Sequence, residues 1–442
     1  MTQTASAPPA TAPPPGQLAF QQPSASTSTS APAARGAISA WFAGTPGRMR
    51  ALLILTAVVA VLFGVAAAQG FQQSDGALQR AEANTAQLVR VQAIHTSLVS
   101  ANADATNAFL VGGLEPPAQR QHFVDSMTTA SKLVAEAATA QPADQQALGE
   151  LNATLLTYQG LIEQARANNR QGLPIGSQYL KDANASLQND SLPLVSALVK
   201  ANEERVSTEF DGVSRGNIWL LVGGLLTLVV LGLTMIWLAK RTHRYVNLPL
   251  AFAGVLVLLT MLVGGTSLAS ASGSAKDTRS HSYADTLAMS RARIAAYDAK
   301  SNESLTLIAR GSGAAFEKDW VDSAKTVDEQ LAVVAGTAPQ AQAPWTTYKT
   351  THTSIRKLDD SGNWDGAVDQ AIGTTGASAN TAFAAFDKAT STKLTDFSTA
   401  ARNDLADARD GLPPIGWLGI PIGIVAALLA AWGLSQRLGE YR

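Results

Sequence analysis

The stretch ALLILTAVVAVLFGVAAA, residues 51–68, contains no charged side chain and decides how the rest of this chain is organised. As a helix rising about 1.5 Å per residue, it is long enough to cross a hydrocarbon core about 30 Å thick. Three more uncharged apolar runs follow it, at 218–239, 248–268 and 415–434. The sequence therefore predicts an all-α membrane protein with four transmembrane helices.

The spans leave two long loops and three shorter segments. The loops, residues 69–217 and 269–414, contain most of the polar sequence. The shorter segments are a tail over 1–50, a link over 240–247 and a second tail over 435–442. Binding of other molecules is therefore expected mainly in the two loops.

Basic residues beside the spans predict the orientation of the chain. They lie before the first span, in the link and after the fourth span: Arg35, Arg48, Arg50, Lys240, Arg241, Arg244, Arg437 and Arg442. The positive-inside rule then places both termini and the link in the cytoplasm, and both loops outside the cell membrane. Because the whole chain has a net charge of −1, the two outer loops must be acidic, which argues against nucleic acid as a partner.

A cleaved signal peptide is the alternative interpretation of the first apolar run. Ala66 and Ala68 form a small-residue pair that a signal peptidase could use. The long preceding tail and the long apolar core favour a retained membrane anchor.

The N-terminal tail is rich in Pro, Ala, Ser and Thr, and its first 47 residues contain no acidic residue. Such a composition buries too little apolar surface to offset chain entropy, so we expect it to be disordered. Trp41 and Phe42 stand near its end. They fit either an aromatic anchor at the membrane interface or a docking epitope for a cytoplasmic partner.

Both loops have the spacing of amphipathic helices. In the first, Leu148, Leu151, Leu155 and Tyr158 recur every three or four residues, which lines one helical face. Glycine and proline clusters near 112–117, 141–142 and 172–176 mark three turns between four helices. Each loop is therefore predicted to form an extracytoplasmic four-helix bundle, with two long outer helices of about 60 Å in the first loop.

An internal repeat relates the two loops. Phe123, Val124, Asp125 and Ser126 recur as Trp320, Val321, Asp322 and Ser323, and the apolar positions that follow match at an offset of 197. The chain is therefore predicted to be a tandem duplication of a span, bundle and span unit.

This organisation resembles the extracytoplasmic four-helix sensor modules of bacterial receptors. The whole chain resembles the actinobacterial GlnX-type membrane proteins, with their Pro/Ala/Ser/Thr tail, four spans and paired helical outer domains. The resemblance implies a relay of extracellular amino-acid availability from the solute-binding lipoprotein GlnH to the cytoplasmic Ser/Thr kinase PknG. A structural scaffold of the envelope and an accessory subunit of a transporter are the alternatives.

No catalytic or metal motif is evident. The five histidines are scattered, there is no cysteine, and we predict a protein that is not an enzyme and that uses no cofactor or metal. His95 and His352 fall on apolar stripes and are expected to be core or boundary histidines. Asp359, Asp360, Asn363 and Asp365 form an acidic turn that lacks the spacing of a calcium loop.

The partner-binding hypotheses concern the two ends of the molecule. At the tip of the first domain we expect Leu110, Val111 and Leu114 to meet Leu173, Pro174 and Ile175, either as self-packing or as a docking patch for a lipoprotein. Trp364 has a comparable place in the second domain. A direct ligand is the other hypothesis, with these arginines as anion partners: Arg90, Arg120, Arg291 and Arg310.

On the cytoplasmic side, the basic link is predicted to contact the soluble partner because it joins spans two and three. The link residues singled out for this role are Lys240, Arg241, His243, Arg244 and Tyr245. Contact with anionic lipid is the competing interpretation for the basic members of this set.

Overall fold

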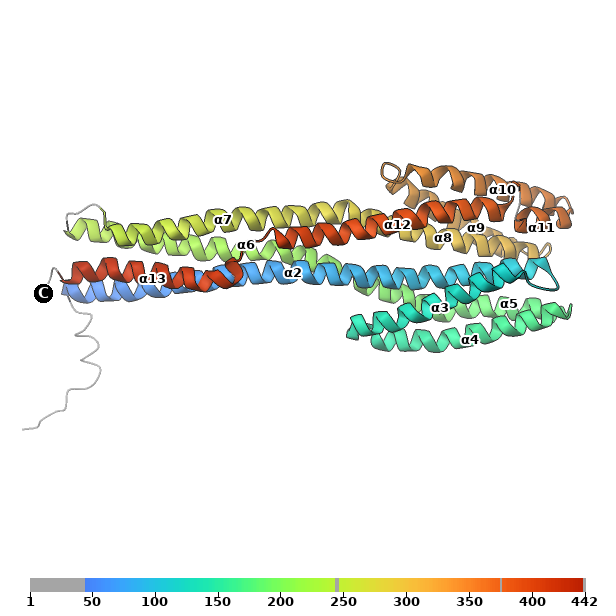
Figure 1. Ribbon diagram of the computed structural model, residues 1–442, viewed down its shortest axis with the longest axis horizontal. Coiled ribbons are helices and arrows are strands. Elements are labelled where there is room, and N and C mark those ends of the chain that lie inside the picture. The colour runs from blue at the N-terminus through green and yellow to red at the C-terminus, as the bar shows by residue number, and fades with distance from the viewer. Residues whose placement is uncertain (1–43, 243–245, 374–375, 440–442) are drawn as a thin grey trace, which may run out of the picture.

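The structure, a computed structural model, describes residues 44–242, 246–373 and 376–439, and within these ranges it is built from helices without a strand (Figure 1). The molecule is a long rod with the termini of the described chain near one end. Its elements are α2 Gly44–Val111, α3 Pro117–Ala140, η1 Pro142–Asp144, α4 Gln145–Arg170, α5 Ile175–Ser186, η2 Leu187–Ser191, α6 Leu192–Thr242, α7 Leu248–Ser280, α8 Ser282–Ile308, α9 Ala314–Val333, η3 Pro339–Ala341, α10 Gln342–Asp360, α11 Trp364–Ile372, α12 Ala379–Asp410 and α13 Ile415–Gly439.

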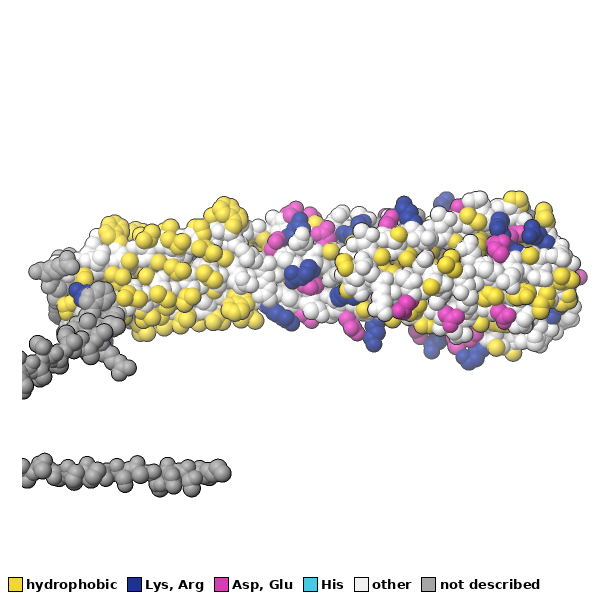
Figure 2. All heavy atoms as spheres, turned by 90° about the horizontal axis from the view of Figure 1, so that it is seen from below, with side chains coloured by type: hydrophobic (Ala, Val, Ile, Leu, Met, Phe, Trp, Pro, Cys, Tyr) yellow, Lys and Arg dark blue, Asp and Glu magenta, His cyan; other side chains and the backbone are white. Residues whose placement is uncertain are grey.

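Four helical stretches are long and apolar enough to cross a membrane: Gly44–Val111, Ile175–Arg241, Leu248–Ile308 and Ala379–Gly439. Hydrophobic side chains cover the surface of one end of the rod, whereas charged side chains are spread over the rest (Figure 2). Leu62, Leu225 and Trp417 in this apolar belt are 58%, 61% and 69% exposed. Such a surface suits lipid, and the prediction of an all-α membrane protein is confirmed.

Close glycine contacts join α2 to α13 in the apolar belt. A Cβ atom on Gly64 would lie 2.6 Å from the carbonyl oxygen of Gly419 and 2.8 Å from the Cα of Gly423. Small residues allow helix backbones to approach this closely, so larger side chains here would force the two helices apart.

Helix α2 has 68 residues and runs without a break from the apolar end to the far tip of the rod. At about 1.5 Å per residue it is roughly 100 Å long. It packs against α6 and α13 near the membrane, and against α3, α8 and α12 farther out. This single helix therefore contacts both distal domains and the membrane helices.

The first helical domain consists of α3, α4 and α5 packed on the distal parts of α2 and α6. The two hairpin helices α3 and α4 have 24 and 26 residues. The π-helical segment η2 joins α5 to α6. The core of the first domain is mainly aliphatic and includes Leu148, Leu151 and Leu155.

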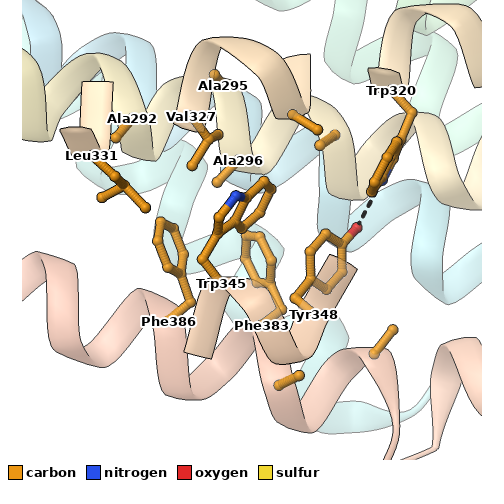
Figure 3. Close-up of a cluster of buried hydrophobic side chains, with 14 of the residues drawn as sticks. Ala292, Ala295, Ala296, Trp320, Val327, Leu331, Trp345, Tyr348, Phe383 and Phe386 are labelled. Carbon is orange, nitrogen blue, oxygen red and sulfur yellow. Dashed lines mark hydrogen bonds between the residues drawn. The ribbon is translucent and has the colours of Figure 1, made fainter. Parts of the chain in front are cut away.

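The second helical domain consists of α8 to α12, and its core contains a cluster of aromatic side chains packed among small aliphatic ones. Trp345 packs at 5.3 Å, centroid to centroid, from both Tyr348 and Phe386. Figure 3 shows Phe383, Phe386 and Tyr348 gathered around Trp345, with Ala292, Ala295 and Ala296 above them in this view. The small side chains on α8 leave room for these rings.

The second domain joins its spans differently from the first. The backbone breaks at His281, between α7 and α8, and again between α12 and α13. Pro413 and Pro414 lie in the second break, where a proline lacks the N–H needed to continue a helix. Continuous rods therefore connect the first domain to the membrane, and interrupted ones connect the second.

The repeated positions occupy matching places in the two domains. Phe123 on α3 and Trp320 on α9 are both buried, at 1% and 8% exposure, while the following Val124 and Val321 are exposed. The offset of 197 therefore relates core positions to core positions. A common origin by duplication stays a prediction.

The two distal domains pack directly against each other. Leu110 of α2 belongs to the core of the second domain, and Leu305 of α8 to that of the first. The side-chain amide of Asn102 donates a hydrogen bond of 2.8 Å to Ser301, and that of Asn107 donates one of 3.1 Å to Asn380. The domains thus share an interface along α2 and α8.

Candidate functional site

The six residues expected to form an apolar patch at the tip of the first domain do not share one surface, because some are exposed and others are buried. Leu114, Leu173, Pro174 and Ile175 are exposed, with Leu114 at 81%. Val111 is half-buried, and Leu110 is buried against the second domain. The prediction that Leu110 shares this patch is wrong because α2 turns that side chain toward the core of the neighbouring domain.

Behind Leu114 lies a cavity of about 210 Å³ between the ends of α2, α3, α4 and α5. Its walls are mostly apolar, but Arg120 and Arg166 also line it. Arg166 forms ion pairs of 3.0 Å with Glu115 and with Glu163, and its guanidinium lies 4.1 Å from the ring centroid of Phe123. These arginine charges are therefore already compensated within the tip.

Trp364 does not form a matching exposed patch on the second domain. Its indole N–H donates a hydrogen bond of 2.9 Å to the carbonyl oxygen of Leu307, and Arg310 lies 3.9 Å from its ring centroid. The half-buried ring is held between α11 and the α8–α9 turn. Its contacts favour a structural role for Trp364.

A buried ionic network crosses the second domain. Lys300 and Glu303 on α8 form an ion pair of 2.8 Å, and Glu303 also lies 2.9 Å from Nδ1 of His352 on α10. The other ring nitrogen of His352 lies 3.2 Å from Glu317 on α9. Three helices are therefore joined by ionisable groups of which Lys300, Glu303 and His352 are almost fully buried.

The neighbours of His352 determine its charge. Burial alone would lower the pKa of His352, but the hydrogen bonds that its ring donates to the carboxylates of Glu303 and Glu317 outweigh burial and raise the pKa above the ordinary value. Burial would likewise raise the pKa of Glu303, but Lys300 and His352 together lower it. The Trp320 ring stacks on His352 at 3.6 Å between centroids. This arrangement stabilises an imidazolium ion in the core.

A second cavity, of about 460 Å³, lies between the two domains and is called the inter-domain cavity below. Side chains from α2, α6, α8 and α9 line it. They are Gln92, His95, Ser196, Val199, Lys200, Glu203, Arg291, Ile294, Ala295, Asp298, Asp322, Ser323 and Thr326. Both domains and the helix that joins them to the membrane therefore contribute to one polar cavity.

Two titratable side chains of this cavity are perturbed by burial. Desolvation lowers the pKa of His95 to about 4, so this ring is neutral near pH 7. Desolvation raises the pKa of Asp298 to about 7, and only a hydrogen bond of 3.5 Å from Gln188 opposes this effect. Perturbed groups in a cleft are typical of functional sites.

The four arginines considered as anion ligands do not converge on one site. Arg90 donates to Gln87, Arg120 pairs with Glu163, and Arg310 stacks on Trp364. Arg291 alone among them lines the inter-domain cavity, where it forms an ion pair of 2.6 Å with Glu203.

The predicted cytoplasmic contacts are only partly described. Trp41, Phe42, His243, Arg244 and Tyr245 lie outside the described residues. Lys240 and Arg241 end α6 and are exposed. The Arg241 guanidinium donates a hydrogen bond of 3.1 Å to the hydroxyl of Thr45, which connects the membrane-side ends of α6 and α2.

The acidic turn before α11 has structural partners. Arg356 pairs with both Asp359 and Asp360, and Asn363 caps α11 by accepting a hydrogen bond from the backbone N–H of Gly366. The residues that the structure describes contain no cluster of three or more metal-ligating side chains.

Comparison with known proteins identifies a sensor domain. Residues 77–211 match the family model described as the actinobacterial sensor domain. No curated protein and no solved structure matches the chain. The matched range covers the first helical domain and its connections toward the membrane, which supports an actinobacterial sensor protein and points to a non-catalytic role.

Sequence reasoning did not find the inter-domain cavity. Gln92 was the one sequence signal that could have indicated the cavity, because it is a polar residue beside Val91 and Ile94 on an apolar stripe. Lys200 and Asp298 are distant in sequence and come together because α6 and α8 both pack against α2. The cavity forms where the two domains pack against each other, and no local sequence pattern predicts that contact.

Proposed function

We propose that this chain is a transmembrane sensor in which α2 relays the state of the two distal domains to the membrane helices. The observation that carries the proposal is the unbroken course of α2, which packs against both domains and against α6 and α13. A stiff helix transmits a shift or rotation along its length, because its backbone hydrogen bonds resist local bending. The sensor-domain match over 77–211 supports this role.

The proposed input comes from outside the cell. The basic flanks of the spans favour extracytoplasmic distal domains, and a solute-binding lipoprotein is the proposed partner. The exposed side chains at the tip of the first domain, Leu114, Leu173, Pro174 and Ile175, supply apolar surface for docking. An extracellular nutrient, in particular an amino acid, is the proposed stimulus.

The proposed output is a cytoplasmic partner such as a Ser/Thr kinase. The hydrogen bond between Arg241 and Thr45 couples the ends of α6 and α2 at the membrane side. A shift of α2 would therefore change the position of the basic link that follows α6. Lys240 and Arg241 are exposed there and are available for a partner.

A helix break in α2 tests this relay. Asp75 is exposed on α2, and proline at this position would remove a backbone hydrogen bond and cost about 3 kcal/mol of local helix stability. In cells, we expect Asp75→Pro to abolish the kinase phosphorylation that follows amino-acid addition. Membrane abundance is measured in parallel by immunoblot.

Two variants serve as controls for this experiment. Asp75→Ala removes the charge but keeps the helix, and Gly411→Pro adds a proline where the backbone is already interrupted between α12 and α13. Both are expected to respond as the parent does. A full response from Asp75→Pro at equal membrane abundance would exclude α2 as the route.

A further inference from the structure

The inter-domain cavity contains a buried side chain with unused hydrogen-bonding capacity. Gln92 is 3% exposed, and within the described structure neither its amide nitrogen nor its amide oxygen has a hydrogen-bond partner. A buried polar group without a partner destabilises the folded protein, because it has lost its hydrogen bonds to water. The fold therefore buries an amide donor and an amide acceptor without partners, on a residue that lines this cavity.

Gln87, five residues earlier on α2, is also a buried glutamine, but its amide is hydrogen-bonded within the fold. It is 2% exposed, and its amide donates hydrogen bonds of 3.1 Å to both the Ala137 carbonyl oxygen and the Asp144 carboxylate. Burial of a glutamine on α2 thus does not require an unpaired amide. The difference between Gln87 and Gln92 points to a role for the latter outside the fold itself.

The cavity also presents one unmatched charge of each sign. Arg291 is neutralised by Glu203, and Asp322 by Lys318. Of the remaining lining charges, Asp298 forms no ion pair, and Lys200 has no hydrogen-bond or ion-pair partner among the described residues. Desolvation raises the pKa of the Asp298 carboxyl group, which a bound cation would reverse.

We propose that the inter-domain cavity binds a small zwitterion of the α-amino acid class. The ligand ammonium would pair with Asp298, its carboxylate with Lys200, and its remaining polar atoms with the free amide of Gln92. The volume of about 460 Å³ is within the range of small-molecule sites. His95, which makes no hydrogen bond within the described residues, offers a neutral ring nitrogen to the same ligand.

The position of the cavity gives such binding a mechanical consequence. Gln92 and His95 are on α2, Lys200 is on α6, and Asp298 is on α8, so one ligand would contact both domains. A ligand that bridges these helices stabilises one arrangement of the domains over others. Binding of the ligand to this cavity does not depend on the proposed relay. Only the effect of that binding on the cytoplasmic output rests on the proposed function.

Equilibrium dialysis on the full-length protein in lipid nanodiscs tests the site without a lipoprotein or kinase. The probes are the twenty radiolabelled α-amino acids, each at concentrations up to the millimolar range, with acetate and methylamine as compounds that carry one charge. We expect saturable binding of at least one amino acid and none of acetate or methylamine. Absence of saturable binding for every amino acid, or equal binding of a singly charged compound, would overturn the proposal.

Variants locate the binding within the protein. Gln92→Leu and Asp298→Asn are each expected to weaken binding by about tenfold or more, because each leaves a polar group of the ligand unpaired. Arg166→Gln in the tip cavity is the control and should bind as the parent does. Binding that is lost in Arg166→Gln and kept in the other two would assign the ligand to the tip and refute the inter-domain site.

The melting temperature without ligand provides an independent readout. Leucine at position 92 removes an unpaired amide and should raise the melting temperature by about 2–4 °C, whereas Gln87→Leu should lower it by a similar amount. A lower melting temperature for Gln92→Leu would mean that its amide is already paired in the free protein, which contradicts the proposal. If binding follows the expected pattern but the kinase response is unchanged in Gln92→Leu, the site stands and the proposed relay fails.

Discussion

The two distal domains have the same order of helices but stabilise it with different side chains. Four consecutive core positions of α4 and α10 correspond at the offset of 197, and all eight residues are buried. The pairs are Leu148 with Trp345, Leu151 with Tyr348, Leu155 with His352, and Tyr158 with Ile355. A similar helical layout thus accommodates Leu side chains in one domain at positions where the other has Trp, Tyr and His.

The polar parts of the two cores differ more strongly. In the first domain, Asn102 accepts a hydrogen bond of 3.3 Å from the Tyr158 hydroxyl and donates one of 2.8 Å to Asn184, so the network is neutral. At the offset of 197, Lys300 and Glu303 of α8 correspond to Ala103 and Thr106 of α2, which are also buried. The second domain therefore places buried charges where the first places uncharged side chains.

This difference suggests a division of roles. Buried charges hold partners at fixed distances but are costly when one partner is lost. The first domain has no charge at these corresponding positions, although elsewhere it buries Asp144 in an ion pair with Arg205. The first domain is joined to the spans by continuous helices, and the second by interrupted ones. We expect the first domain to transmit movement and the second to respond more sharply to pH and to single substitutions.

The largest expected effect is the loss of stability when the corresponding aromatic residues of α3 and α9 are replaced. Phe123→Ala and Trp320→Ala should each destabilise their own domain by about 3–5 kcal/mol through lost burial and a cavity. Trp320 should lie at the upper end because it also stacks on His352 and donates a hydrogen bond of 3.4 Å to Tyr348. Thermal unfolding of the full-length protein in detergent, with pulse proteolysis to identify the unfolded domain, measures both effects.

Val124→Ala and Val321→Ala are the matched controls, since these side chains follow the aromatic residues but are exposed. They should change stability by less than about 0.5 kcal/mol. If the aromatic variants behaved like these controls, the equivalence between α3 and α9 would be refuted.

Much of this fold could be predicted from local sequence. Uncharged runs identified the spans, and Gly112 and Gly172, both with positive φ, lie just beyond the ends of α2 and α4, where the glycine signals predicted turns. Position 352 was also recognised as a core histidine because it continues an apolar stripe. These features depend on residues close together in the chain.

The candidate site could not be predicted in the same way. Lys300 and Glu303 have helical pairing distance, but their contact with His352 depends on how α10 packs against α8. Leu110 was assigned to an exposed tip because the sequence does not show that a second domain covers it. Both the ionic network and the burial of Leu110 depend on packing between helices that are far apart in the sequence.

The next largest effect concerns the ionic core. Glu303→Gln leaves Lys300 buried without its counter-ion and should destabilise the second domain by about 3 kcal/mol. Replacing the network with the first domain's residues at the offset of 197, as Lys300→Ala, Glu303→Thr and His352→Leu together, removes all three charged groups. This triple variant should be more stable than Glu303→Gln, because no uncompensated charge remains.

Urea unfolding of the full-length protein, followed by domain-specific proteolysis, compares the two variants. Asn102→Ala in the first domain is the control for loss of a neutral polar group and should cost about 1–2 kcal/mol. A triple variant less stable than Glu303→Gln would show that the second domain needs its charges and that the two cores are not interchangeable.

The smallest expected effect is a pH dependence of opposite sign in the two domains. The pKa of His352 is raised in the folded protein by Glu303 and Glu317, so its stabilising contribution is complete below about pH 6.5 and is lost as pH rises through the folded value. The pKa of His95 is lowered to about 4, so its contribution is present above about pH 6.5 and is lost as pH falls toward 4.

Each histidine changes the free energy of unfolding by at most about 1.4 kcal/mol per pH unit, so the measurement must compare domains within one protein. Glu303 does not interfere above pH 6, since its pKa is lowered from an ordinary value of 4.5. Burial also raises the pKa values of Asp104 and Asp298 to about 7, so the measurement uses Asp104→Asn with Asp298→Asn as the background. In this background we expect the second domain to lose stability relative to the first between pH 6 and 9 in pulse proteolysis. His352→Gln should remove this alkaline trend and leave the acid trend, while His95→Gln should do the reverse. An alkaline trend that persists in His352→Gln would mean that a different group titrates, and that the buried imidazolium does not distinguish the second core from the first.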